Sequence, residues 1–114
     1  MEKISQSKIE FVNHASVIFT GEKINLLSDP WYSLSAFHNG WNLIYENLDS
    51  DISNIIEKIT HIWISHEHPD HFSVPFFIKY KELLKIKKIK ILFQETQDKR
   101  VINFLKSLNL DTIE

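Results

Sequence analysis

The 114-residue chain carries 13 basic and 15 acidic side chains and a net charge of -2, and it has no apolar run approaching the roughly 18 residues that a membrane span needs. This balance excludes the basic surface typical of nucleic-acid-binding proteins, and the length predicts one domain over residues 1–114. Because cysteine is absent, the chain itself cannot form a disulfide, a thiolate-ligated zinc site or an iron–sulfur cluster.

The first part of the chain is predicted to be extended. "KIEFVNH" (8–14) alternates polar and apolar residues, "ASVIFTGEK" (15–23) continues this pattern to a turn at Gly21, and "INLLSDP" (24–30) is an apolar run that a proline ends. These segments favour a hairpin or a meander. Residues 31–48 are rich in aromatic side chains but have no clear period, so we expect a long irregular segment there.

From Ser50 onward, helical and extended patterns alternate. Isoleucines spaced i, i+3, i+4 and i+7 predict a short helix with Ser50 or Asp51 near its cap. Ser73 followed by Pro75 is typical of a helix start. The expected helices span 51–58, 74–86 and 97–108, and the expected strands span 60–65, 89–94 and 111–114. This alternation predicts an α/β layer.

The stretch "HEHPDH" directly follows the expected strand over 60–65. His66 and His68 lie at i and i+2, so an extended chain projects both imidazoles to the same side, where they can approach one cation. Asp70 and His71 follow after a proline and can reach a second position beside it. Imidazole and carboxylate donors suit zinc, iron or manganese, and a metal pair about 3.5–4 Å apart can hold a bridging hydroxide. The alternative is a surface loop that is merely rich in histidine.

The "HEHPDH" motif resembles the signature of the metallo-β-lactamase superfamily of metal-dependent hydrolases. "VNHASVIF" is similar to the first strands of the branch with ascorbate-6-phosphate lactonases and N-acyl-phosphatidylethanolamine phospholipase D. "SDPWYSLSAFHNGW" resembles a segment of CMP-N-acetylneuraminate hydroxylase-like proteins. Over residues 8–110 the resemblance implies an α/β fold, the N-terminal half of a four-layer αβ/βα sandwich, with helices on one side of a mixed sheet. The chain would then be a single partial domain.

The resemblance also implies a role for each residue of the motif. His66 and His68 would bind one metal, and Asp70 and His71 would bind the second. Asp70 would in addition orient the attacking hydroxide as its general base. The implied cofactor is one or two divalent ions, with zinc expected and manganese or iron as alternatives.

Other candidate residues lie outside the motif. His14 and Asp29 match positions near the pocket in this branch, where they would support the metal ligands or line the pocket; the alternative is an ordinary strand-end residue. His38 is expected to be solvent-exposed, and His61 to pack or hydrogen-bond within its strand. Three aromatic residues of the irregular segment either line a substrate cleft or clamp that segment to the core: Trp31, Phe37 and Trp41.

In the superfamily, the second half of the fold supplies another histidine for each metal and an acidic bridging ligand. This chain has no histidine after His71, so we expect about two protein ligands per metal, below the three usual for catalytic zinc. A half-sandwich also leaves one sheet face without a partner. We therefore expect a homo-oligomer or a complementing C-terminal half.

The leading hypothesis is the N-terminal part of a cytoplasmic metal-dependent hydrolase that activates water against a phosphorylated or sugar-derived small molecule. A truncated, catalytically inactive remnant acting as an interaction or dimerisation module is the alternative. A third hypothesis, oxygenase chemistry as in the sugar-nucleotide hydroxylases, requires a Rieske cluster, which a chain without cysteine cannot ligate.

Overall fold

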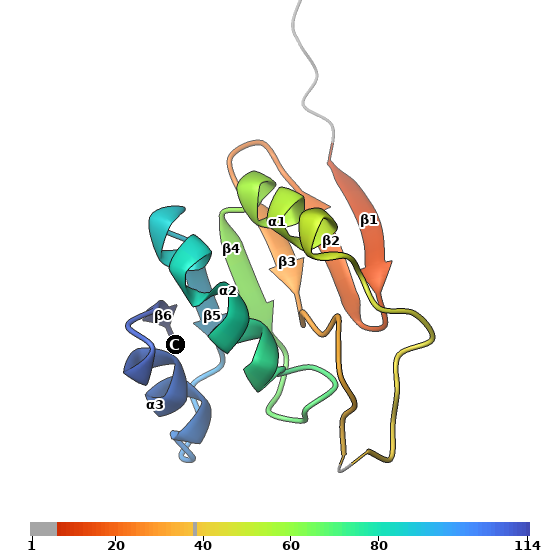
Figure 1. Ribbon diagram of the computed structural model, residues 1–114. Helices are drawn as coiled ribbons and strands as arrows, with labels where there is room; N and C mark the ends of the chain where they lie inside the picture. The colour runs from red at the N-terminus through yellow and green to blue at the C-terminus, as the bar shows by residue number, and fades with distance from the viewer. Residues whose placement is uncertain (1–6, 38) are drawn as a thin grey trace, which may run out of the picture.

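In the computed structural model, which describes residues 7–37 and 39–114, six strands form one sheet in chain order (Figure 1). The strands are β1 (Lys8–Asn13), β2 (Ser16–Thr20), β3 (Asn25–Ser28), β4 (His61–Ile64), β5 (Lys90–Phe93) and β6 (Asp111–Ile113). The helices are α1 (Asp49–Lys58), α2 (Val74–Ile86) and α3 (Arg100–Ser107). The expected α/β fold class is confirmed. The prediction for His38 falls outside the described residues.

The sheet is mixed because two kinds of connection build it. Tight turns join β1, β2 and β3, which pair antiparallel; at the second turn, Gly21 N donates to Ile24 O at 2.9 Å. A helix connects each later pair, so β3 to β6 run parallel. Right-handed crossovers that always advance in one direction place their helices on the same side of the sheet, and Figure 1 shows α1 and α2 across one face.

The core lies between this face and the helices. Leu27, Ile62 and Ile91 are direct neighbours on β3, β4 and β5, and each is 0% exposed. Each such side chain contributes about 1.5–3 kcal/mol through burial. The helices cover them with residues spaced by one helical turn: Ile52, Ile55, Ile56, Phe76, Phe77, Leu84, Val101, Ile102 and Leu105.

Helix starts were predicted with mixed success. Ser73 caps α2 as expected, because its Oγ accepts from Phe76 N at 3.3 Å. The expected cap of α1 at Ser50 or Asp51 is wrong: the N-cap is Leu48, without a side-chain cap. Asp49 instead binds Lys79 Nζ at 2.5 Å and Tyr80 Oη at 2.8 Å on α2, which fixes the first turn by a contact between helices.

The third helix begins later than predicted, at Arg100 rather than Gln97. Asp98 accounts for this difference, because its Oδ1 accepts from Arg100 N at 3.0 Å while its own carbonyl accepts from Thr96 Oγ1 at 2.6 Å. Such local bonds favour a turn over a helix. Residues 31–37 and 39–48 form no helix or strand, as predicted, and contain one isolated bridge between Ala36 and Trp41.

The second face of the sheet carries exposed apolar side chains. Ile9 and Phe19 are register partners on β1 and β2 and are 69% and 41% exposed, and Phe11 is 66% exposed. Contiguous apolar surface of this kind marks an interaction site or a liability to aggregate. None of the described helices is long and apolar enough to cross a membrane.

We therefore predict that the purified chain associates through this face. Light scattering coupled to gel filtration should give a mass above 13.5 kDa, and Phe11→Thr combined with Phe19→Thr should shift the population toward the monomer. Ile44→Thr is the matched control, since Ile44 is fully exposed on an irregular segment and belongs to no strand. A wild type that stays monomeric and melts cooperatively would contradict the prediction.

Candidate metal centre

The candidate site forms where three segments meet at one edge of the sheet. Asp29 directly follows β3, the loop 65–73 follows β4, and His14 lies in the β1–β2 turn. Because β1, β3 and β4 run in the same direction, their carboxyl ends lie at the same edge, where α/β sheets usually place their sites. Asp29 N donates to Trp63 O at 2.9 Å, which attaches this end of β3 to β4.

A buried carboxylate organises the loop after β4. Asp29 is 5% exposed. Its Oδ1 accepts from Ser65 N at 2.7 Å, and its Oδ2 accepts from Ser65 Oγ at 2.7 Å. The same Oδ2 lies 2.9 Å from His71 Nδ1. A carboxylate only accepts hydrogen bonds, so this contact orients His71 with Nδ1 toward Asp29 and Nε2 toward the Asp70 carboxylate.

Ser65 links the Asp29 carboxylate to a second histidine, His66. Its hydroxyl proton goes to Asp29, so its oxygen is left to accept, and His66 Nδ1 lies 3.0 Å away. His66 is therefore held with Nδ1 protonated and Nε2 free, the form in which histidine binds metals. The ring of His66 lies 4.0 Å from that of His71 and 4.7 Å from that of His68, measured between centroids.

Asp70 lies at the centre of the cluster. It is 5% exposed, and its Oδ2 is 3.0 Å from His14 Nε2 and 3.2 Å from His71 Nε2. Its Oδ1 is buried and has no hydrogen-bond partner among the described residues. A buried acceptor without a partner costs about 1–3 kcal/mol. A cation beside this oxygen would remove that cost, so the donor set fits a metal.

Two groups of donors satisfy the spacing of a metal site. His66, His68 and Asp70 form one, and His14, Asp70 and His71 form the other; within each group the ligand atoms lie within 4.8 Å of one another. The structure thus brings together the four motif residues and His14, and Asp29 contacts the cluster through His71. The role of each in binding metal stays a prediction.

Sequence reasoning missed Ser65. A serine at the end of a strand carries no signal of its own, and its partner Asp29 is 36 positions away in the sequence. The other histidine predictions are also placed: His61 Nδ1 lies 2.7 Å from Thr60 Oγ1, at the start of β4 and away from the cluster. Of the aromatic candidates, Trp31 is 2% exposed and Trp41 is 52% exposed.

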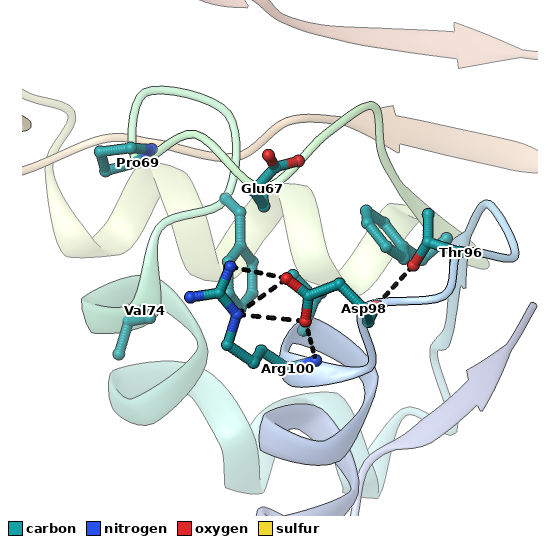
Figure 2. A pocket seen from close by; sticks show the side chains of 9 residues that line it. Glu67, Pro69, Val74, Thr96, Asp98 and Arg100 are labelled. Carbon is teal, nitrogen blue, oxygen red and sulfur yellow. Dashed lines mark hydrogen bonds and ion pairs between the residues drawn. The ribbon is translucent and has the colours of Figure 1, made fainter.

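A pocket lies beside the candidate metal site rather than on it. It has a volume of about 450 Å³, and Figure 2 shows it between the loop after β4 and the start of α3. Arg100 at its rim binds Asp98, with Nη2 at 2.6 Å from Oδ2. The lining contains none of the histidines: Glu67, Pro69, Phe72, Val74, Phe93, Thr96, Asp98, Arg100 and Val101.

No family model matches the chain, but curated relatives do. Cytidine monophosphate-N-acetylneuraminic acid hydroxylase from Danio rerio is 30% identical over 67 residues, covering 59% of this chain and 11% of the relative. The enzymes of the same name from Cricetulus griseus and Sus scrofa are 38% identical over 69 residues and 39% over 62 residues, covering 60% and 54% of this chain. The matched region is 12% and 14% of those relatives.

Solved structures share the fold over nearly the whole chain. CmlA, a diiron β-hydroxylase from Streptomyces venezuelae, superposes with a TM-score of 0.63 at 20% identity, covering 100% of this chain and 21% of that one. A possible metal-dependent hydrolase from Veillonella parvula superposes with a TM-score of 0.60 at 19% identity, covering 95% of this chain and 40% of that one. At these identities the likeness establishes the fold.

The Ser65 hydroxyl gives a first prediction for this site. Ser65→Ala should weaken metal binding about tenfold, the lower end of what outer hydrogen-bond partners of metal ligands contribute, because His66 loses the group that holds its Nδ1 proton. Calorimetric titration with Zn²⁺ measures this. Ser107→Ala is the control, since that hydroxyl is exposed on α3 and bonds only Phe104 O. Equal affinity of Ser65→Ala and wild type would contradict the assignment.

Proposed function

The resemblance to the N-terminal half of the metallo-β-lactamase superfamily is confirmed by the relatives and the shared fold, and from it we propose that the chain carries the metal-binding part of a metal-dependent hydrolase. The substrate class is a phosphorylated or sugar-derived small molecule. The observation that carries the proposal is Asp70, whose buried carboxylate belongs to both donor groups and has one oxygen free.

The donor set supports water activation. One or two bound divalent ions would lower the pKa of a coordinated water toward about 7 and polarise the scissile bond. The residues of the chain hold the site ready for this: Asp29 and Ser65 orient His66 and His71. Asp70, which belongs to both donor groups, is proposed to orient the attacking water as its general base.

The activity belongs to a larger assembly than the described residues. The chain spans about a tenth of the length of the curated relatives, and 40% of the possible metal-dependent hydrolase. Further ligands and most of the substrate contacts are proposed to come from a complementing half or a second copy, docked on the exposed sheet face that carries Ile9, Phe11 and Phe19.

Oxidative chemistry is a second candidate, because the relatives are named hydroxylases and one similar structure is a diiron β-hydroxylase. Absence of cysteine excludes a Rieske cluster within the chain but does not bear on iron held by histidine and carboxylate, a donor set that suits iron as well as zinc. An oxygenase that uses iron without a Rieske cluster is therefore compatible with this chain.

Metal binding tests the proposal against the inactive-remnant alternative. The wild type should bind Zn²⁺, Mn²⁺ and Fe²⁺ in equilibrium dialysis, and Asp70→Asn should weaken binding at least tenfold, since an amide supplies no charge. His61→Gln is the control because His61 lies at the far end of β4. A wild type that retains no metal would support the remnant instead.

The metal that supports turnover distinguishes hydrolysis from oxidation. A hydrolase should cleave bis(p-nitrophenyl) phosphate or a simple lactone when loaded with Zn²⁺ or Mn²⁺ and consume no oxygen. An oxidative enzyme should consume oxygen only with Fe²⁺ and a reductant. Oxygen consumption that depends on Asp70, without hydrolysis under any loading, would replace the hydrolase with the second candidate.

A further inference from the structure

We propose that His14 is itself a metal ligand and that the Asp70 carboxylate is shared by two metals, one bound with His66 and His68 and the other with His14 and His71. This inference rests on the proposed metal-dependent function. It goes beyond the role expected for His14 from the sequence, which was to support ligands or line the pocket. Three donors per metal would then come from this chain.

The distances fit a second site. Ligand atoms about 2.1 Å from a tetrahedral metal are about 3.4 Å from one another. Asp70 Oδ2 is 3.0 Å from His14 Nε2 and 3.2 Å from His71 Nε2, and the three ligand atoms all lie within 4.8 Å of one another. Small adjustments of side chains would bring all three around one ion.

The arrangement around His71 also favours a cation here. Its Nδ1 lies 2.9 Å from Asp29 Oδ2, and its Nε2 lies 3.2 Å from Asp70 Oδ2. With Nδ1 directed at Asp29, Nε2 is the nitrogen placed to bind an ion beside Asp70. Such an ion would also lie next to the carboxylate whose second oxygen has no partner.

Aromatic side chains hold the His14 ring toward the cluster. The ring packs edge to face on Trp31 at 5.1 Å and on Trp41 at 6.4 Å, measured between centroids. Trp31 is itself fixed, since it is 2% exposed and its Nε1 donates to Leu34 O at 3.0 Å. The His14 side chain keeps 34% of its surface exposed, so an ion can reach it from solvent.

The backbone of His14 decides which replacement can test its side chain. His14 has a φ of 50° in a two-residue turn between Asn13 and Ser16. Glycine adopts this left-handed region freely, whereas a side chain there costs roughly 1–2 kcal/mol. Glycine is therefore tolerated at this position.

Cobalt titration of the wild type and His14→Gly tests the inference. Glycine removes the imidazole and relieves the strained backbone, so the variant should fold. The wild type should bind two Co²⁺ ions with the visible bands of a nitrogen- and oxygen-ligated site, and His14→Gly should bind one. His66→Ala should lose the other ion, and His61→Gln, the matched control, should keep both.

Circular dichroism and thermal melting establish that each variant is folded. His14→Asn, which also tolerates a left-handed backbone, repeats the test if glycine loosens the hairpin. His14→Gly that still binds two ions within threefold of the wild-type affinity overturns the role of His14 and leaves the proposed function standing. A wild type that binds one ion overturns the two-metal arrangement, and a wild type that binds none overturns the proposed function as well.

Discussion

The site depends on one buried carboxylate, that of Asp29. It follows β3, yet both of its oxygens bind Ser65, which follows β4, and one of them also contacts His71. One side chain thus joins the ends of two parallel strands and helps to orient two histidines, because Ser65 also contacts His66. This contact reaches the loop 65–73, whose outer residues Glu67, His68 and Pro69 are exposed.

Much of this arrangement could be predicted from the spacing of residues that are close in the sequence. The fold class, the helix 74–86 and the motif His66 to His71 all follow from spacings within a few residues, where covalent geometry limits what side chains can do. His14 and Asp29 were found only through resemblance to a family, because they reach the motif across 56 and 42 positions of sequence. The sequence did not predict the role of Ser65 or the contacts of Asp49 at the start of α1. Both depend on partners that are distant in the sequence and come close only in the folded chain.

One face of the sheet is buried and the other is exposed, and both follow from the side on which the helices pack. Helices that follow right-handed crossovers all pack on one face and bury Leu27, Ile62 and Ile91 there. The same rule leaves Ile9 and Phe11 on the other face without cover from the described residues. The candidate metal site lies at the carboxyl ends of β1, β3 and β4, an edge that both faces share. In the proposed assembly, a partner docked on the open face would lie beside this site and could add ligands and substrate contacts.

The donor set also explains why similar folds carry out both hydrolysis and oxidation. Imidazole and carboxylate bind zinc, manganese and iron alike, so nothing in His66, His68 and His71 selects between a metal that activates water and one that activates oxygen. Asp70 differs from them, because it is buried and one of its oxygens has no hydrogen-bond partner among the described residues. The surroundings of this carboxylate, rather than the number of histidines, are therefore where the proposed hydrolase and the second candidate would differ.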